Sequence, residues 1–379
     1  MPLQFLRQIF EDHRSNTALI HRDRPFTYDW LLGRIDLWRD QLTSHGVDAG
    51  RVVVIESDFS PDAVALLLSL IETGGIAIPI TPVVRGKREE YLQIANPDRV
   101  VTLQNTAPPQ WDELTPGIPN QLYDHLREVQ HPGLVLFSSG STGQSKAVVH
   151  DFTLLLKKFI RPGKNLRTLP FLLFDHIGGI DTLFYALSNA SCLVIVEDRS
   201  PDAVCAAIER HRVEVLPASP TFLNLLLLSE SYKHHDLSSL KYITYGTEVM
   251  PAATLERCAT LFPDVRILQK YGTSEVGTLR SQSRGSDSVW VRIGGEGYRT
   301  RVVDGILQIK AESAMLGYLN APSPFTNDGW FVTGDVVEQD GDYLRIMGRE
   351  SDIINVGGRK VYSADVEAVL QQMDNVAEA

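Results

Sequence analysis

A run of small, hydroxyl-bearing residues between two apolar segments is the part of this sequence best suited to chemistry. Leu134–Phe137 has the pattern of a buried strand, and the segment SSGSTGQSK follows it. Glycines let backbone N–H groups approach an anion, hydroxyls add donors, and Lys146 adds a full positive charge. The sequence therefore predicts a phosphate-binding loop, formed by Ser138, Ser139, Gly140, Ser141, Thr142, Gly143 and Lys146.

This segment has two other possible interpretations. A Walker-type loop has glycine before its lysine and a hydroxyl residue after it, and it opens a helix. Here Ser145 precedes Lys146, and Ala147–His150 has the pattern of a strand. A mobile surface loop of serine and glycine is the other alternative. The short length of the segment and the apolar runs on both sides favour phosphate binding.

A second polar segment, QKYGTSEVGT at residues 269–278, has the groups that a nucleotide needs. The ring of Tyr271 is flat enough to pack against adenine, and Glu275 offers the oxygen ligands that Mg²⁺ prefers. Taken alone, Glu275 could equally be an ordinary surface residue. Among the small neighbouring residues, Gly272 would allow a nucleotide to approach the backbone closely, and Thr273 and Ser274 add hydroxyls.

Two more segments extend this candidate nucleotide site. An apolar strand at 242–245 runs into Gly246, Thr247 and Glu248, which suits a ligand bound at the carboxyl end of a strand. Further on, Asp335 has the geometry to accept two ribose hydroxyls, and Arg349 could contact ribose or phosphate. The alternative for Asp335 is a plain turn residue beside Gly334.

The elements that must position these residues alternate between strand and helix patterns, which predicts an α/β fold with largely parallel sheets. After about residue 285 the pattern changes to short alternating segments separated by Asp-Gly turns, which predicts a small antiparallel β subdomain. The predicted strands are 51–56, 75–80, 192–196, 213–216, 289–293, 299–303, 306–310, 332–337 and 343–346; the predicted helices are 61–73, 181–188, 200–211 (capped by Ser200) and one that starts at 363.

The bulk composition narrows the class of protein. The 379 residues carry a net charge of −11, which argues against a nucleic-acid partner. Cys192, Cys205 and Cys258 form no metal-binding pattern and are expected to be small core residues. No signal peptide or membrane span is recognisable. A cytoplasmic protein is therefore expected.

Taken together and in this order, these segments resemble the ANL superfamily of adenylate-forming enzymes, which includes acyl- and aryl-CoA synthetases, peptide-synthetase adenylation domains and luciferases. SSGSTGQSK resembles the phosphate loop of this family, and YGTSE resembles its nucleotide motif. TGD at 333–335 and GRESDIINVGGRK at 348–360 resemble its ribose aspartate and its domain junction. AVALLLSLIETGGIAIPITP at 63–82 resembles an early helix–strand signature.

The resemblance implies that ATP and a carboxylic acid form an acyl-adenylate and pyrophosphate, and that the acyl group then passes to coenzyme A or to carrier-protein phosphopantetheine. It implies catalytic roles for Thr142, Lys146, His176 and Glu275, with Glu275 as the Mg²⁺ ligand. It further implies an N-terminal body at 1–349, followed at 350–379 by a hinge, with Ser351 as the hinge residue, and the truncated start of a C-terminal lid.

Two departures from the family pattern are mild. Ser145 stands in place of a proline, and Ser274 in place of a threonine. A third is larger, because no segment after Ser351 resembles the lid motif that carries a catalytic lysine. Three explanations stay open: a chain cut short, which is favoured; a lid from another chain; or a naturally reduced, non-catalytic adenylate-binding module. Adenylation by these 379 residues is expected to be slow.

The acid-binding pocket is predicted to be mostly apolar, which favours an aryl or fatty acid. His176 and Gly179 resemble a His-x-x-Gly pattern of CoA ligases, whereas Phe174-Asp175 also resembles the Phe-Asp of amino-acid adenylation domains, whose aspartate binds an ammonium group. An amino-acid substrate therefore remains the alternative. The predicted pocket residues are Phe174, Asp175, His176, Ile177, Gly178, Phe222, Val276 and Gly277.

Overall fold

The computed structural model describes residues 3–104, 107–115, 119–139, 144–356 and 359–362, together with Val366 and Leu370. The chain forms two compact units. Unit 1 comprises Met1–Ile195 and Ser313–Ser323, and unit 2 comprises Val196–Glu312 and Pro324–Ala379. No helix within the described ranges is long and apolar enough to cross a lipid bilayer.

Unit 1 is built on a seven-stranded sheet in the order β19-β8-β7-β4-β3-β5-β6. The four central strands β7, β4, β3 and β5 are parallel; β8 and β6 run antiparallel to them, and β19 runs antiparallel to β8. The strands are β3 (Val52–Glu56), β4 (Ile76–Ile80), β5 (Arg99–Thr102), β6 (Gln110–Glu113), β7 (Gly133–Ser139), β8 (Ser145–Asp151) and β19 (Gly317–Tyr318).

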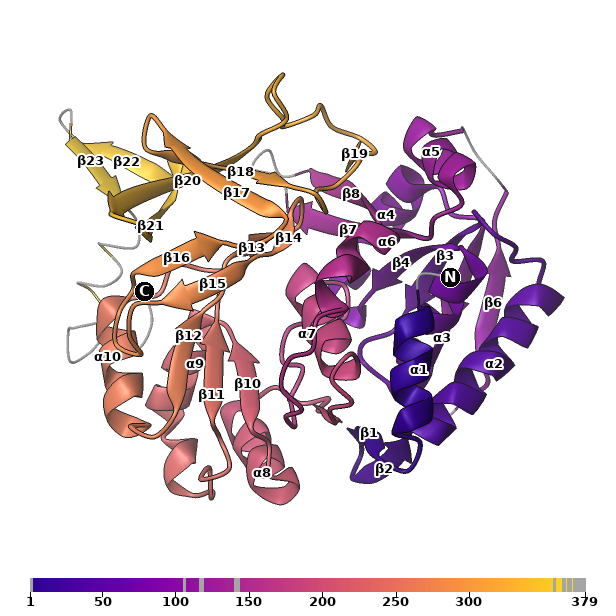
Figure 1. The fold of residues 1–379 in the computed structure, drawn as a ribbon, viewed down its shortest axis with the longest axis horizontal. Coiled ribbons are helices and arrows are strands. Elements are labelled where there is room, and N and C mark those ends of the chain that lie inside the picture. Colours follow the sequence, from indigo (N-terminus) through magenta and orange to yellow (C-terminus); the bar gives the residue numbers. More distant parts are fainter. Residues whose placement is uncertain are drawn as a thin grey trace. The chain divides into compact units, whose positions relative to one another are not determined.

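Alternation along the strands divides the interior of unit 1 into two cores. Val53 and Ile55 face one core, where α1, α2, α3 and α7 pack (Figure 1). Val52 and Val54 face the other, where α4 and α5 pack. This alternation is the period of two that a strand buried on both faces requires. The helices of unit 1 are α1 (Gln4–Asp12), α2 (Tyr28–Ser44), α3 (Pro61–Thr73), α4 (Arg88–Ala95), α5 (Gln121–Val129), α6 (Phe152–Leu156) and α7 (Ile177–Leu187).

Helix α3 shows how local sequence sets an element of this core. Ser60 caps its start by accepting the N–H of Ala63 at 3.1 Å, and Pro61 occupies the first turn. Gly74 ends the helix with φ 76°, a conformation that glycine adopts without steric cost. Each fully buried leucine or isoleucine on the helix contributes about 1.5–3 kcal/mol. The predicted range 61–73 is confirmed.

A smaller sheet, β2-β1-β9, completes unit 1. β1 (Thr17–His21) and β2 (Arg24–Thr27) form an antiparallel hairpin, and β9 (Leu193–Ile195) pairs with β1 in parallel. Arg22 and Asp23 at the hairpin turn both have positive φ, at 51° and 61°. That combination is the backbone of a tight turn that matches the twist of the two strands.

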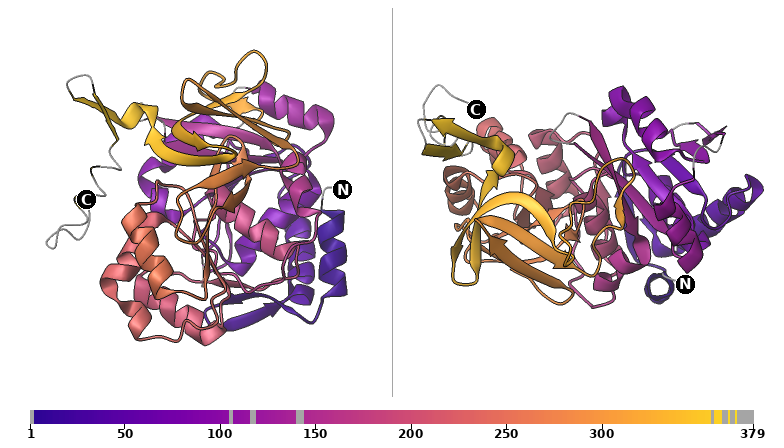
Figure 2. Two further views of the ribbon diagram at one scale, coloured as in Figure 1. Left: turned by 60° about the vertical axis from the view of Figure 1, so that its left-hand side comes forward. Right: turned by 90° about the horizontal axis from the view of Figure 1, so that it is seen from above.

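Unit 2 has a parallel three-stranded sheet, β10-β11-β12, followed by a six-stranded antiparallel sheet, β15-β16-β21-β20-β18-β17 (Figures 1 and 2). The first sheet carries α8 (Pro201–His211), α9 (Pro220–Ser229) and α10 (Ala252–Leu261). The strands are β10 (Val215–Ala218), β11 (Tyr242–Tyr245), β12 (Arg266–Gln269), β13 (Gly272–Thr273), β14 (Gly277–Thr278), β15 (Arg280–Ser283), β16 (Val291–Gly294), β17 (Tyr298–Val303), β18 (Ile306–Ala311), β20 (Phe331–Asp340), β21 (Tyr343–Arg349), β22 (Ile353–Val356) and β23 (Arg359–Tyr362).

These elements confirm the predicted α/β class and the antiparallel β subdomain, with three local corrections. The antiparallel sheet already includes β15, so it begins at residue 280. Helix α7 begins at Ile177, four residues before the predicted start. Ser200 occupies the N-cap position of α8, but its side chain makes no capping hydrogen bond. The helix predicted to start at 363 lies mostly outside the described residues. All three cysteines are buried, as expected.

Candidate functional site

The predicted phosphate loop connects two antiparallel strands of unit 1. β7 ends at Ser139 and β8 begins at Ser145, with Ser138 directly opposite Lys146 in the register. Gly140, Ser141, Thr142 and Gly143 lie outside the described residues. Lys146 extends over the ring of Tyr318, with its Nζ 5.3 Å from the ring centroid, within the range of a cation–π contact. The structure thus describes the two ends of the loop.

Ser145 fixes one of these ends, and its N–H and hydroxyl make contacts that a proline could not. Its side chain is buried, its N–H donates to Glu90 at 2.9 Å, and its carbonyl accepts from Asn320 at 2.8 Å. Asn320 also accepts the N–H of Ala147 at 3.1 Å, and Lys87 Nζ lies 3.4 Å from Ser145 Oγ. The N–H of Ser145 is the main cause that lowers the pKa of Glu90. Sequence reasoning missed Glu90 and Asn320.

Asp175, predicted for the acid pocket, is held by Thr81, the residue after β4. The backbone N–H and the hydroxyl of Thr81 both donate to Asp175 Oδ2, at 2.9 and 2.7 Å. Burial raises the pKa of Asp175, and the bonds from Thr81 partly oppose that rise. One oxygen of this carboxylate therefore already has two donors from the protein itself.

His176 begins α7 and is fixed in one tautomer by its capping role. Its Nδ1 accepts the N–H of Gly178 at 3.0 Å, so the neutral ring carries its proton on Nε2. Burial lowers the pKa of His176, and the charge of Asp175 opposes that shift only in part. Phe174 is fully buried and meets Phe59 edge to face, at 5.0 Å between centroids. Ile177 is buried on α7.

In unit 2, two of the predicted segments leave the sheet at one edge. β11 and β12 are parallel, with Tyr245 opposite Gln269, and the N–H of Lys270 donates to Tyr245 O at 2.7 Å. A Cβ on Gly246 would lie 2.7 Å from Lys270 O, so only glycine fits there. Thr247 follows with φ 76°, which is strained for a β-branched residue. Strained backbone at the carboxyl edge of parallel strands is typical of ligand sites.

Tyr271, Asp335 and Arg349 form one network in unit 2, in which Tyr271 and Asp335 are buried and Arg349 is exposed. The Tyr271 hydroxyl donates to Asp335 Oδ2 at 2.5 Å, and Arg349 Nε lies 2.8 Å from Asp335 Oδ1. Asp335 and Arg349 are directly opposite in the β20–β21 register, which explains their pairing. Burial raises the pKa of Asp335, whereas Arg349 and the Tyr271 bond pull it down. Burial also raises the pKa of Tyr271 far above its ordinary range.

Glu275 lies near this network, at the turn between β13 and β14. Its negative charge contributes to the raised pKa of Asp335, so the two carboxylates interact electrostatically. The N–H of Glu275 donates to Thr273 Oγ1 at 3.3 Å. A carboxylate near a second one suits Mg²⁺, which also takes phosphate oxygens as ligands. Among the described residues no cluster of three metal-ligating side chains occurs, so Mg²⁺ would depend on the phosphates for most of its ligands.

The remaining predicted residues of unit 2 have varied surroundings. Glu248 accepts from the N–H and hydroxyl of Thr221, at 3.1 and 2.7 Å, in the first turn of α9. Its carboxylate thus supports a helix end. Phe222, Val276 and Gly277 are buried, and Ser274 is half-buried. Ser351 is exposed in a short 3-10 turn, Glu350–Asp352, and donates to Asp352 at 2.8 Å.

The predicted residues that the structure describes divide between the two units. In unit 1 they lie at the ends of the loop and at the start of α7: Ser138, Lys146, Phe174, Asp175, His176, Ile177 and Gly178. In unit 2, one group lies beyond the ends of β11 and β12: Gly246, Thr247, Tyr271, Gly272, Thr273, Glu275, Asp335 and Arg349. The partners Thr81, Glu90 and Asn320 are not among the predicted residues, because their sequence neighbourhoods carry no signal for these contacts.

Comparison with known proteins gives a consistent result. The family model described as AMP-binding enzyme matches residues 6–304. Indoleacetate–CoA ligase of Aromatoleum aromaticum is 24% identical, over 96% of this chain and 81% of its own length. An indenyl-propanoyl:CoA ligase of Mycobacterium tuberculosis is 32% identical over 65% of this chain, and the match spans 52% of that ligase.

A solved structure extends the likeness to the fold. The anthranilate CoA ligase AuaEII, crystallised with anthranoyl-AMP, superposes with a TM-score of 0.79 at 21% identity, over 98% of this chain and 82% of its own. At that identity the match concerns the fold alone. It confirms the predicted architecture, because the strand–helix order of both units is shared over nearly the whole chain.

Proposed function

Because the chain belongs to the family of AMP-binding enzymes, we propose that it activates a carboxylic acid with ATP and transfers the acyl group to a thiol. In the first step a carboxylate oxygen bonds to the α-phosphorus and the bond to pyrophosphate breaks. In the second, a thiol attacks the acyl carbon and AMP leaves. Coenzyme A is the acceptor that the relatives' names favour. A carrier-protein phosphopantetheine is the alternative acceptor.

The observation that supports this proposal most strongly is the buried carboxylate of Asp335. Arg349 occupies one lone pair of Oδ1 and Tyr271 occupies one of Oδ2. Each carboxylate oxygen accepts about two hydrogen bonds, so each keeps one for a further donor. Two adjacent hydroxyls, as on the ribose of ATP, match that pair of acceptors. Tyr271 and Arg349 would then hold the carboxylate in a fixed orientation, which lowers the entropic cost of binding.

The other groups of unit 2 fit the base and the metal. The Gly246–Glu248 segment and the Tyr271 side chain would border the adenine, with the strained Thr247 setting the course of the backbone. Gly272, Thr273 and Ser274 would line the same edge. Glu275 would ligate Mg²⁺, whose charge would offset the repulsion between Glu275 and Asp335. When bound, Mg²⁺ neutralises charge on the phosphates and the leaving pyrophosphate.

In unit 1, the loop from Ser138 to Lys146 would neutralise the phosphates through backbone N–H groups, the hydroxyls of Ser139, Ser141 and Thr142, and the Lys146 ammonium. Glu90 and Asn320 would hold the loop end in place through Ser145. The reaction needs no covalent protein intermediate, because positioning and charge neutralisation lower the barrier.

For the acid, we propose an apolar or aryl carboxylate. His176 stays neutral near pH 7, since burial lowers its pKa, and its Nε2–H can donate to a carboxylate oxygen without adding a charge. Phe174 supplies a buried aromatic wall. An amino acid is the weaker alternative, because Thr81 already holds the Asp175 oxygen that an ammonium group would use.

The proposal is tested by calorimetric titration of ATP in the presence and absence of Mg²⁺, a measurement that needs no residue outside the 379. Asp335→Asn should weaken binding at least about tenfold, since a charge-assisted hydrogen bond is lost. Tyr271→Phe should weaken it less. Asp340→Asn, the same change on the same strand at an exposed ion pair with Arg284, is the matched control.

The result that would overturn the proposal is ATP uptake that is independent of Mg²⁺ or equal in Asp335→Asn and wild type. Substrate class is tested with 3-phenylpropanoate and phenylalanine, which differ only by the ammonium group. Tighter binding of 3-phenylpropanoate is expected. Tighter binding of phenylalanine would favour the amino-acid alternative.

A further inference from the structure

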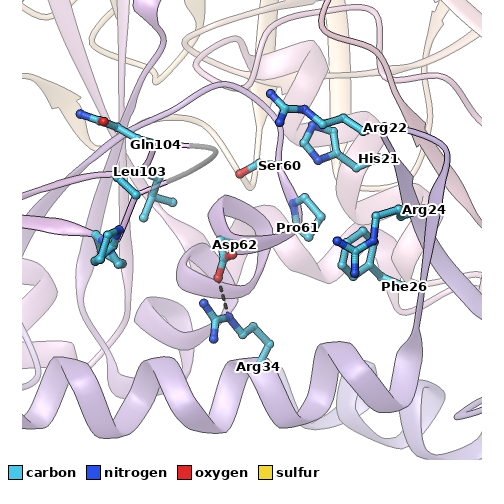
Figure 3. A pocket seen from close by; sticks show the side chains of 13 residues that line it. His21, Arg22, Arg24, Phe26, Arg34, Ser60, Pro61, Asp62, Leu103 and Gln104 are labelled. Atoms are coloured by element: carbon cyan, nitrogen blue, oxygen red, sulfur yellow. Dashed lines mark hydrogen bonds and ion pairs between the residues drawn. The ribbon is translucent and has the colours of Figure 1, made fainter.

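Unit 1 has a cavity whose lining includes none of the residues assigned to the adenylate site (Figure 3). Its volume is about 410 Å³, within the usual range for small-molecule sites. Three elements form its walls: the β1–β2 hairpin, the first turn of α3, and the segment that follows β5. Arg34 reaches the cavity from α2.

The charge of this cavity is opposite to that of the whole chain. Arg22, Arg24 and Arg34 line it, with Asp62 as the one carboxylate among the lining residues, so their net charge is +2. The chain as a whole carries −11. Asp62 is itself held, because Arg34 Nε lies 2.5 Å from its Oδ1 and Trp38 Nε1 donates to the same oxygen at 3.0 Å. The carboxylate is therefore neutralised where an anion would otherwise meet repulsion.

The hairpin turn sets the direction of two of these arginines. Arg22 has φ 51° and Asp23 has φ 61°, positions where asparagine and glycine are the usual residues. Figure 3 shows Arg22, Arg24 and Arg34 around one hollow, although they come from the hairpin and from α2. Arg24 is exposed, lies over the Phe26 ring with its Cζ 5.9 Å from the centroid, and forms no ion pair with the residues that the structure describes.

Most of the other lining residues are apolar, and His21, Ser60 and Gln104 add polar groups. Phe26, Pro61 and Leu103 contribute side chains, and two prolines of the segment after β5 complete the wall. A guanidinium group recognises phosphate oxygens through paired N–H donors, while the apolar wall suits a ring or a short chain. The lining thus fits a small molecule that has a doubly charged head and an apolar body.

We propose that this cavity binds a small phosphomonoester with an aromatic or apolar body, at a site separate from ATP. A dianion is favoured over a carboxylate because the net charge of the lining is +2. The small volume of the cavity, about 410 Å³, favours a free small molecule over a phosphorylated side chain of another protein. The phosphate contacts Arg24 and Arg34, and the body contacts Phe26.

The test is calorimetric titration of phenyl phosphate at about pH 8, where its phosphate is doubly charged, in about 0.05 M salt and with saturating ATP and Mg²⁺. Wild type should bind one equivalent. Arg24→Ala should weaken binding at least about tenfold, as expected for loss of a charge-assisted bond. Phenyl sulfate, with the same shape and one charge less, should bind more weakly.

Arg14→Ala is the matched control, because Arg14 is an exposed arginine of unit 1, paired with Asp29 at 2.8 Å, that does not line the cavity. Circular dichroism confirms that each variant is folded. Three results would each overturn the proposal. The first is an equal loss of affinity for phenyl phosphate in Arg24→Ala and Arg14→Ala. The others are displacement of phenyl phosphate by ATP and the absence of binding by wild type. Tighter binding of a phosphotyrosine tripeptide than of phenyl phosphate would overturn the small-molecule assignment.

Discussion

The contact between Thr81 and Asp175 gives a prediction that tests the geometry of unit 1 without any substrate. Thr81 is almost fully buried, and its N–H and hydroxyl donate to one oxygen of Asp175. Thr81→Val keeps the shape of the side chain and the backbone donor but removes the hydroxyl. A hydrogen bond to a charged group contributes about 1.5–3 kcal/mol. We therefore expect the free energy of unfolding of unit 1 to fall by about 2 kcal/mol.

The Asp175→Asn background supplies the control for charge. The amide oxygen can accept the same two bonds, but as a neutral acceptor, for which the contribution is about 0.5–1.5 kcal/mol. Thr81→Val should then cost only about 1 kcal/mol, which leaves a coupling energy of about 1 kcal/mol. Hydrogen-exchange mass spectrometry of β4 peptides during a urea titration reports on unit 1 separately from unit 2.

Equal costs of Thr81→Val in the two backgrounds would refute this reasoning. That outcome would mean that Asp175 does not act as a charged acceptor for Thr81. The carboxylate would then be available to a substrate ammonium group, and the amino-acid alternative would gain support. This double-mutant cycle of Thr81→Val and Asp175→Asn thus decides between a structural and a substrate-binding role for Asp175.

Two further predictions concern the loop end and the start of α7. Ser145→Pro, which introduces the residue that the family pattern has, should lower stability and weaken ATP binding in calorimetry, because Glu90 loses its N–H donor; unchanged affinity would show that this contact does not position the loop. Burial lowers the pKa of His176 in the folded chain below the value of about 6.5 that histidine has in the unfolded chain. Neutral His176 therefore contributes fully to stability above about pH 6.5, and this contribution is lost as the pH falls below that value. Asparagine can cap the helix without titrating, so the urea midpoint of His176→Asn should fall less than that of wild type between about pH 7 and 5. Parallel plots of urea midpoint against pH for the two proteins would contradict a role of His176 titration in stability.

The elements that the sequence predicted well are those whose boundaries depend on adjacent residues. Helix α3 has a serine cap, a proline in its first turn and a glycine after its end, so its limits could be read directly. Helix α7 was placed too late because Gly178 and Gly179 argue against a helix interior. There the helix starts early because His176 accepts the N–H of Gly178, a role that histidine seldom takes.

The candidate site likewise has features that local sequence predicts and features that it does not. Residue type was enough to suggest which side chains could bind a nucleotide, because hydroxyls, glycines, a lysine and carboxylates each bring a defined chemistry. Their protein partners were not predictable, since Asn320 lies 175 residues from Ser145 and Thr81 lies 94 residues from Asp175. Such contacts depend on the folded sheet, and no local pattern encodes them.

Those partners change what each predicted residue can do. Glu248 is predicted to lie beside the adenine, and one of its carboxylate oxygens also supports α9 by accepting two hydrogen bonds from Thr221. Asp335 also has two protein partners, yet they bind different oxygens, so each oxygen keeps an acceptor for a ligand. The distribution of donors over the two oxygens therefore separates a carboxylate committed to structure from one prepared for a ligand. By that criterion we expect a nucleotide to contact Asp335, through the acceptor that remains on each oxygen.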